Sequence, residues 1–414
     1  MKKALRRKTG RVLVSTVSFP PDFTGAGLRA LRLCERLNRT YGINFNVLCS
    51  RKDGKYASDD DNKGISITRF SLTTEDGLWF PLHILLVFIK FNAYMIRNRK
   101  KIDVIHFFSF SWMNRIIMLS NILFYKKRSI LEVTLDGFDD FSSLLHTGKR
   151  NKLFHHFTKF LLKRINRFIL PSQGKIGSYI REGVSRNQLI VRPYAVDEEI
   201  FASIGFRQKD KLRKKLDLPN KFIMLNVGMV YPRKNQLFLI RCLELLNRKD
   251  VVLLLIGPDD PDDKGYKHRL QKYVNSHGLG RQVMFLGIKN NINEYMVASD
   301  VFVFSSESEG FPNVLAEATV SGLPIITLSL DCLDSLNSFI NIETGKIIMR
   351  ENFTDRDVHK HFTDALKHML TRKLKYDRKR IRTLGLHHFS SKKADEKYLS
   401  IYSDLTDSKG LAGI

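Results

Sequence analysis

Residues 301–326 read VFVFSSESEGFPNVLAEATVSGLPII, and this stretch decides the fold of the second half of the chain. It begins with four apolar residues, 301–304, that are followed by serines, which is typical of a buried parallel strand. A loop with glycine and proline follows, and Asn313 begins a helical pattern that stops at Gly322. The next strand is predicted over residues 324–327. The order of strand, loop, helix and strand indicates an α/β unit.

The first turn of this helix, over residues 312–315, is a candidate anion site. Backbone N–H groups in a first helical turn have no partner within the helix and lie at the positive end of its dipole. A diphosphate is therefore a suitable ligand. Glu309 precedes the turn, and Glu317 follows eight positions later, which is ~12 Å in an all-helical segment. That separation is too large for an acid/base carboxylate pair, but it suits contacts with hydroxyl groups at two ends of an elongated ligand.

These residues resemble the signature of a known family. Glu309 and Glu317 form an E-x7-E pattern, and EGFPNVLAEA followed by GLPII is similar to the C-terminal domain of retaining, nucleotide-sugar-dependent glycosyltransferases of family four, which have the GT-B fold. The resemblance implies that Glu309 contacts the donor sugar, as a candidate catalytic residue, and that Glu317 contacts the ribose. The residues between them are implied to bind the donor: Gly310, Phe311, Pro312, Asn313, Val314 and Leu315. The alternative is that both glutamates are solvated charges, because two glutamates at this spacing are common.

A second candidate phosphate site follows the strand predicted over residues 222–227. Gly228 begins a turn, and Arg233 and Lys234 precede a predicted helix. Lysine supplies a compact charge and arginine a fork of donors, so the pair could clamp a diphosphate and stabilise its departure. The segment resembles the phosphate-binding motif of the same family, in which an arginine follows the glycine. Because Met229 stands there, the match rests on Lys234, with Arg233 as a candidate substitute and a solvated basic pair as the alternative.

The chain begins with a similar strand, glycine loop and helix. The strand is predicted over residues 11–17, and Gly25 and Gly27 precede a helical pattern of leucines. Glycine lets a backbone approach a phosphate or sugar closely, although such glycines more often make only a tight turn. The loop resembles the PPxxGG loop of the family, with Ala26 between the two glycines. Gly25 and Gly27 are therefore candidate donor-binding residues.

One further loop of the first half carries candidate acidic residues. It follows the strand predicted over residues 129–134 and contains Asp136 and Asp139. Many relatives have a histidine near the position of Asp136, close to the donor sugar. Either aspartate could accept hydrogen bonds from sugar hydroxyls, which makes Asp136 a candidate catalytic residue. An Asp-Gly turn without a role in binding is an equally good explanation.

Other patterns of the first half concern its organisation. Strands are predicted over residues 45–49 and 65–70, with a polar loop over 51–63 between them. Residues 78–96 are about as long as a bilayer requires. Polar or helix-breaking residues interrupt this segment: Pro81, His83, Lys90 and Asn92. We therefore expect a mostly buried helix there, with contact of a part of it with a membrane surface as the alternative.

The length of 414 residues predicts two domains. The resemblance extends over nearly the whole chain and implies a GT-B architecture, in which two Rossmann-like α/β domains face a cleft. We expect an acceptor domain over residues 1–203 and a nucleotide-sugar domain over residues 204–385. Residues 386–414 are expected to form a helix that crosses back to the first domain, and a tail.

The charge of the chain indicates an anionic partner. Lysine and arginine together number 69, aspartate and glutamate 42, and the formal net charge is +27 at pH 7. Nucleic acid, an anionic membrane and an acidic polymer would all fit this excess. Residues 149–167 alternate basic and apolar residues at helical spacing, which makes them a candidate for contact with a membrane surface. Apolar stripes of this kind more often face a core.

The four cysteines have no CxxC spacing, so the sequence predicts neither a disulfide framework nor a zinc site. No acidic DxD motif stands beside the phosphate motifs, so no metal is expected, and the nucleotide sugar is expected as a co-substrate without a further cofactor. The apolar run over residues 12–17 is too short for a signal peptide. We expect a cytoplasmic protein that is peripheral at the inner face of the membrane.

The function that the resemblance implies is transfer of a sugar from a nucleotide diphosphate to a hydroxyl of a glycan or lipid-linked acceptor, with retention, in the biosynthesis of a cell-surface polysaccharide. The expected partners are this donor, this acceptor and an anionic membrane surface, without nucleic acid. One alternative is a basic nucleic-acid-binding protein on a degenerate transferase scaffold, in which cations and aromatic residues would form a continuous stripe. Another is a GT-B epimerase that acts on the nucleotide sugar itself, which explains the E-x7-E block less well.

Overall fold

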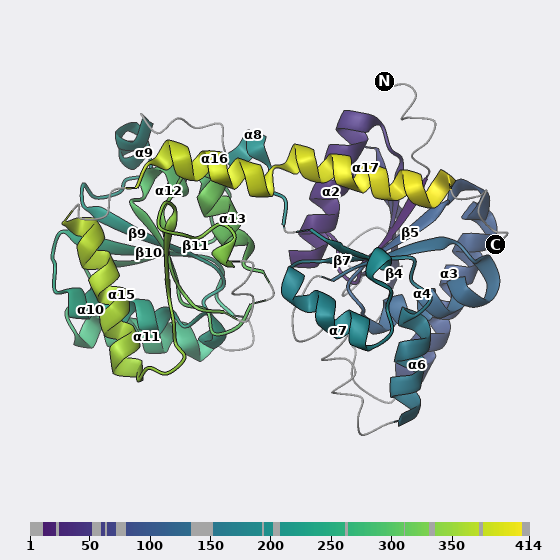
Figure 1. Cartoon of the computed structure of the whole chain (residues 1–414), viewed down its shortest axis with the longest axis horizontal. Coiled ribbons are helices and arrows are strands. Elements are labelled where there is room, and N and C mark those ends of the chain that lie inside the picture. Colours follow the sequence, from purple (N-terminus) through teal and green to yellow (C-terminus); the bar gives the residue numbers. More distant parts are fainter. Residues whose placement is uncertain are drawn as a thin grey trace. The chain divides into compact units, whose positions relative to one another are not determined.

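The structure is a computed structural model that describes residues 11–21, 25–51, 59–62, 64–71, 80–133, 152–192, 194–201, 208–260, 264–309, 311–330, 336–371 and 376–407. The chain divides into two compact units, and each contains a sheet with helices packed on it (Figure 1). Unit 1 comprises Met1–Arg192 and Lys392–Ile414, and unit 2 comprises Pro193–Ser391. The predicted architecture of two Rossmann-like α/β domains is confirmed.

Unit 1 contains an eight-stranded sheet in the order β3-β4-β2-β1-β5-β6-β7-β8. Its strands are β1 (Val12–Ser15), β2 (Phe45–Arg51), β3 (Asp59–Asn62), β4 (Ile65–Ser71), β5 (Val104–Phe108), β6 (Arg128–Glu132), β7 (Arg167–Leu170) and β8 (Leu189–Val191). Neighbouring strands are parallel except β3 and β4, which are antiparallel. The prediction of a loop over residues 51–63 is therefore wrong for residues 59–62, which form β3. This strand has the sequence DDDN, and charges are tolerated there because it lies at the sheet edge.

Helices cover both faces of this sheet. They are α2 (Gly25–Tyr41), α3 (Phe80–Asn98), η1 (Arg99–Lys101), α4 (Trp112–Ser120), η2 (Asn121–Tyr125), α6 (Lys152–Leu162), η4 (Gln173–Lys175), α7 (Ile176–Arg181), η5 (Arg186–Gln188) and α17 (Ser391–Asp407). Leu13 of β1 faces a core shared with α3, α4 and α6, whereas Val12 and Val14 face a core shared with α2 and α17. This division follows from the alternation of side chains along a strand. The last helix of the chain, α17, therefore belongs to unit 1, as the sequence predicted.

Unit 2 contains a six-stranded parallel sheet in the order β11-β10-β9-β12-β13-β14. Its strands are β9 (Phe222–Val227), β10 (Val251–Ile256), β11 (Val283–Gly287), β12 (Val301–Phe304), β13 (Ile325–Leu328) and β14 (Gly345–Ile348). All residues of β10 and β12 are buried, because helices cover both faces. The strands predicted around residues 301–304 and 324–327 are present, the second one residue later than predicted.

The helices of unit 2 are α8 (Glu198–Phe201), α9 (Lys209–Lys215), η7 (Pro232–Lys234), α10 (Gln236–Leu246), α11 (Lys264–Ser276), α12 (Ile292–Ala298), α13 (Asn313–Val320), α15 (Asp355–Leu370) and α16 (Arg378–Phe389). Side chains of α12, α13 and α16 share one core with the sheet, and side chains of α10, α11 and α15 share the other. Figure 1 shows these two groups on opposite sides of the sheet.

The contacts of the chain place the change from unit 1 to unit 2 at Arg192 and Pro193, whereas the sequence placed it after residue 203. The difference arises because Tyr194, Val196 and Phe201 are buried in a core of unit 2. These apolar residues precede the charged run that served as the boundary signal. The return to unit 1 falls at Lys392, six residues after the predicted start at residue 386.

Two helices of unit 1 bear on the expected contact with a membrane. In the described part of the chain, no helix is long and apolar enough to cross a membrane. Within the segment predicted as a basic amphipathic helix, Leu161 and Leu162 are buried in the core. By contrast, α3 was expected to be mostly buried, but Leu85 and Ile89 are 51% and 53% exposed.

Candidate active site

The strand order of unit 2 reverses between β9 and β12. The sheet continues from β9 to β10 and β11 on one side, and from β12 to β13 and β14 on the other. Open parallel sheets bind ligands at such a reversal, at the carboxyl ends of the strands. The connection after β9 contains Gly228 and η7, and the connection after β12 contains residues 305–309. The fold therefore brings two motifs that are far apart in the sequence to one place.

An ion-pair cluster joins these two connections. The Nζ of Lys234 lies 2.5 Å from Oε1 of Glu309, and Nη1 of Arg233 lies 3.1 Å from the same oxygen. The hydroxyl of Ser306 also donates to this oxygen, at 2.7 Å. In the described part of the chain, Oε2 of Glu309 accepts no hydrogen bond, so this oxygen could accept one from a ligand hydroxyl. Two cations face one carboxylate, which leaves a positive charge for an anionic group.

Hydrogen bonds fix the backbone around this cluster. The hydroxyl of Ser305 donates to the carbonyl oxygens of Lys234 and Asn235, at 3.0 and 2.8 Å. The N–H of Glu307 donates to the carbonyl oxygen of Arg233 at 2.8 Å. These bonds hold the short helix η7 against the loop after β12. The geometry of the basic pair is thus set by the backbone and not only by the charges.

The glycine at the start of the first motif supports the lysine side chain. A Cβ at Gly228 would lie 3.7 Å from Cε of Lys234, so the lysine stem passes over this glycine. Gly257 also approaches Gly228 closely. A Cβ at Gly257 would lie 2.0 Å from the carbonyl oxygen of Gly228, and Gly257 has a φ of +151°. Only glycine fits at position 257 without a shift of the turn. The ammonium of Lys234 also lies 5.6 Å from the centroid of the Phe304 ring.

The helix α13 begins beside the loop that carries Glu309. Pro312 is its N-cap residue, with an extended backbone. Phe311 packs against Phe339 and Phe389, with ring centroids 6.0 and 5.9 Å away. These contacts anchor the start of the helix. The N–H groups of Asn313 and Val314 lie at the end of the helix that favours an anion. The N–H of Leu315 instead donates to the carbonyl oxygen of Pro312 at 2.9 Å.

Glu317 differs from Glu309 in its surroundings. It lies within α13 and is 9% exposed, so it is not a solvated surface charge. Its Oε1 lies 3.4 Å from the hydroxyl of Tyr194. A nearly buried carboxylate is costly unless it is hydrogen-bonded. The alternative that both glutamates of the E-x7-E pattern are solvated charges is therefore wrong.

The remaining candidate residues are not part of this cluster. Gly25 is the first residue of α2 in unit 1, and Gly27 is buried within the same helix. Asp136, Asp139 and Gly310 lie outside the described residues. Among the described residues, no three side chains of the metal-binding types gather into a group that could hold a metal ion.

Sequence reasoning missed a buried polar cluster in unit 1. Glu132, the last residue of β6, is 1% exposed. It lies 2.5 Å from Nη2 of Arg29 and 3.4 Å from Nε2 of His106, and it accepts a hydrogen bond of 2.5 Å from Tyr398 of α17. Burial alone would raise the pKa of Glu132, but Arg29, His106 and Arg192 lower it to about 2. A signal was present in the sequence, because Glu132 stands between the apolar residues Leu131 and Val133 in the strand predicted over residues 129–134.

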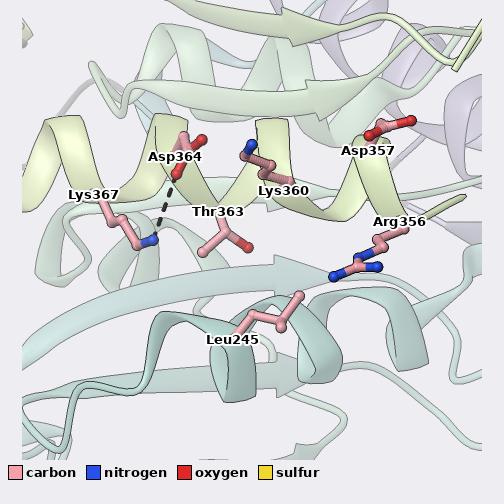
Figure 2. Close-up of a pocket in the computed structure, with 7 residues that line it drawn as sticks. All are labelled: Leu245, Arg356, Asp357, Lys360, Thr363, Asp364 and Lys367. Carbon is pink, nitrogen blue, oxygen red and sulfur yellow. Dashed lines mark hydrogen bonds and ion pairs between the residues drawn. The ribbon is translucent and has the colours of Figure 1, made fainter. Parts of the chain in front are cut away.

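A pocket of ≈ 530 Å³ lies between α10 and α15, away from the predicted motifs (Figure 2). Figure 2 shows its lining side chains: Leu245, Arg356, Asp357, Lys360, Thr363, Asp364 and Lys367. Acidic and basic side chains alternate along α15, and Lys367 pairs with Asp364 at 3.5 Å. The charges nearly balance, and none of these residues belongs to the predicted donor site.

The chain is similar in sequence to known glycosyltransferases. Residues 208–368 match the family described as Glycosyl transferases group 1. The chain is 25% identical to the capsular polysaccharide biosynthesis glycosyltransferase CapH of Staphylococcus aureus, over 84% of this chain and 88% of that protein. It is 28% identical to a UDP-Gal:α-D-GlcNAc-diphosphoundecaprenol α-1,3-galactosyltransferase of Escherichia coli, over 54% and 56% of the two chains. The chain spans about half the length of some of its relatives, 44% and 56% for two of them.

The fold has solved counterparts. A structure of HepE from Anabaena in complex with UDP superposes with a TM-score of 0.73 over 95% of this chain and 100% of that chain, at 17% identity. Two parallel α/β units, with basic and acidic motifs at a sheet reversal, define a protein of the GT-B class. Within this class, residues 208–368 carry the match to the group 1 glycosyltransferases. The family predicted from the E-x7-E block is confirmed.

Proposed function

We propose that this protein transfers a sugar from a nucleoside diphosphate to a hydroxyl group of a glycan or lipid-linked acceptor, with retention at the anomeric carbon. The observation that carries the proposal is the cluster of Lys234, Arg233 and Glu309 at the reversal of the unit 2 sheet. It offers two cations and one carboxylate, whose Oε2 accepts no hydrogen bond from the described residues, beside the first turn of α13. A diphosphate and a sugar hydroxyl are the groups that match these charges.

Each residue of the cluster has a role in this proposal. Lys234, Arg233 and the N–H groups of α13 would hold the diphosphate and stabilise the charge that develops on it as the bond to the sugar breaks. Oε2 of Glu309 would accept a hydrogen bond from the donor sugar, while its Oε1 positions Lys234. Glu317 would accept hydrogen bonds from the ribose. We assign no nucleophile among the described residues. In this proposal the leaving phosphate would take the proton of the acceptor, and catalysis would rest on positioning and charge stabilisation.

The names of relatives support a substrate class. One relative is named for capsular polysaccharide biosynthesis, and another for transfer to a diphosphoundecaprenol-linked sugar. We infer that this protein acts in the biosynthesis of a cell-surface polysaccharide, on a lipid-linked or glycan acceptor. The net charge of +27 fits work at the anionic inner face of a membrane. Within this proposal the protein is cytoplasmic and peripheral.

A thermal-shift panel tests the proposal first. Nucleoside diphosphates and their sugar conjugates are added one at a time, with inorganic diphosphate and nucleoside monophosphates as controls. A ligand that binds only the folded protein adds ~2.7 kcal/mol of stability at 100 times its Kd. One nucleoside diphosphate and its sugar conjugate should raise the melting temperature more than both controls. Stabilisation by nucleic acid alone, or by none of these ligands, would contradict the proposed activity.

A further inference from the structure

The helix α3 presents a row of apolar side chains to solvent. Leu82, Leu85, Ile89 and Ile96 are 43%, 51%, 53% and 70% exposed. Their spacing of three, four and seven residues places them on one face of the helix. The opposite face carries Val87, Phe91 and Met95, which are buried in the core of unit 1. The helix is therefore apolar on both faces, although only one face is packed against the protein.

The short helix η2 extends this exposed face. Leu123 and Phe124 are 52% and 59% exposed. The ring of Phe124 contacts Phe88 of α3 in an edge-to-face arrangement, with centroids 6.1 Å apart. Tyr125 of η2 donates a hydrogen bond of 2.9 Å to the side chain of Asn92, so the two helices are held together. The exposed apolar side chains of η2 thus lie on a segment packed against α3, and we call the exposed apolar residues of both helices the α3–η2 surface.

Cations border the α3–η2 surface. Exposed basic side chains lie in the last turn of α3 and after both helices: Arg97, Arg99, Lys100, Lys101, Lys126 and Arg128. The basic residues after α3 lie close to those after η2, because Nζ of Lys127 donates to the carbonyl oxygen of Arg99 at 2.8 Å. Between Asp76 and Glu132 the sequence contains one acidic residue, Asp103, and it is paired with Arg11 at 3.5 Å. An apolar face with a border of one sign of charge is complementary to a lipid surface with anionic headgroups.

We propose that the α3–η2 surface docks the protein on an anionic bilayer. α3 would lie in the plane of the interface, with Leu85 and Ile89 among the acyl chains and the cations at the headgroups. This assigns the membrane contact to α3 and η2 and not to α6, the centre of the segment that the sequence favoured, because Leu161 and Leu162 of α6 are buried in the core and Phe157 and Phe160 pack against it. The inference rests on the proposed membrane-peripheral function and names the surface responsible for it.

Vesicle co-sedimentation of the full chain tests this assignment without donor or acceptor, so it is independent of the proposed activity. Leu85→Gln/Ile89→Gln should lower the partition constant on phosphatidylcholine vesicles that contain phosphatidylglycerol by roughly tenfold or more. Ile180→Gln/Ile342→Gln is the matched control, since these side chains are 45% and 86% exposed elsewhere, and it should change binding less than about twofold. Equal losses in both variants, or none, would overturn the assignment.

A second pair of variants tests the role of the cations. Arg99→Gln/Lys100→Gln/Lys101→Gln should weaken binding by roughly a hundredfold, since each cation near an anionic surface contributes about fivefold. Lys211→Gln/Lys214→Gln/Arg281→Gln removes the same charge from exposed positions of unit 2 and should weaken it much less. Salt should reduce wild-type binding and shrink the difference between the two variants. If both variants lose binding equally, only the net charge matters and the surface is not specific.

A probe of insertion gives a direct readout that does not depend on a loss of binding. An environment-sensitive fluorophore is attached to Ile89→Cys or to Ile342→Cys, with Cys332→Ser in both proteins. The three described cysteines are buried. Anionic vesicles should shift the emission to the blue at position 89 and not at position 342. If the vesicles leave position 89 unchanged, or if Leu85→Gln/Ile89→Gln instead dissolves a dimer in solution, the occupant is not a bilayer.

Discussion

The ammonium nitrogen of Lys234 lies 2.5 Å from Oε1 of Glu309, although 75 positions separate the two residues in the chain. The contact joins the connections that follow two neighbouring strands, β9 and β12, at the reversal of the unit 2 sheet. It links the residue proposed to bind the diphosphate with the residue proposed to bind the sugar. Glu309 would therefore hold Lys234 in place before the donor binds and share it with the phosphate afterwards.

The first prediction separates the two basic residues. Lys234 is 19% exposed and its stem passes over Gly228, whereas Arg233 is 43% exposed and is bound to the carbonyl oxygen of Ser308. Lys234→Ala should lower the turnover number by roughly a hundredfold, as expected for loss of a preorganised charge at a developing anion. Arg233→Ala should lower the turnover number less than Lys234→Ala does, and Met229→Arg should leave the protein active. If Arg233→Ala is the more damaging change in a folded protein, Arg233 is the main diphosphate ligand.

The second prediction concerns the turn beneath Lys234. Gly257→Ala should destabilise unit 2 severely, because the new Cβ would lie 2.0 Å from the carbonyl oxygen of Gly228 at a φ of +151°. Gly278→Ala is a suitable control, since Gly278 has a φ of +66° with no atom within 4 Å of the new Cβ. Gly278→Ala should lower the free energy of unfolding only through the strain of the backbone, by about 1–2 kcal/mol. Urea unfolding of both variants measures the difference, and similar losses would contradict the close approach of these two glycines.

The third prediction uses the buried carboxylate of unit 1. The pKa of Glu132 is lowered to about 2 in the folded protein, below its ordinary value of ~4.3 in an unfolded chain. A lowered pKa contributes stability that is present above the unfolded value and is lost as the pH falls through the folded value. The difference corresponds to a contribution on the order of 3 kcal/mol at neutral pH. Glu132→Gln should therefore unfold at lower urea than the wild type at pH 7.

The same experiment at lower pH provides the control for this prediction. Between pH 5 and pH 2.5 the difference between the wild type and Glu132→Gln should shrink, because Glu132 takes up a proton when the chain unfolds. Glu343→Gln removes an exposed carboxylate that pairs with Arg380 at 3.3 Å, with both side chains about half exposed. It should change the free energy of unfolding by less than about 1 kcal/mol at any pH. A constant difference for Glu132→Gln across this range would contradict the lowered pKa.

Local patterns were sufficient to predict the strands and helices around the donor motifs. Residues 301–326 carry a buried strand, a glycine-proline loop and a helix stop, and β12 and α13 follow these signals closely. Buried parallel strands are apolar throughout, so they are easy to recognise. The edge strand β3 was missed because its aspartates satisfy none of the usual strand preferences. Its pairing with β4 is a tertiary contact that no local pattern contains.

Contacts between distant parts of the chain explain the other differences. The sequence indicated Lys234, Arg233 and Glu309 one by one, but only the strand order places them in one ion-pair cluster. The exposure of α3 could not be predicted because Leu85 and Val87 are equally apolar, and only packing against the sheet distinguishes them. The ion pair of Glu132 and Arg29 crosses from β6 to α2 and likewise depends on the assembled sheet.

The central claim is that Glu317 binds the ribose and Glu309 the sugar of one donor. The most direct test is calorimetric titration of the best nucleoside diphosphate into the wild type, Glu317→Ala and Glu309→Ala, after circular dichroism has shown that both variants are folded. We predict that Glu317→Ala weakens binding by roughly tenfold or more, because the ribose loses a buried acceptor. Glu309→Ala should bind the diphosphate about as tightly as the wild type, because the hydrogen bonds of Ser305 and Glu307 still fix the backbone of the basic pair. It should lose turnover with the intact donor. Equal weakening of nucleoside diphosphate binding by both changes would contradict this claim.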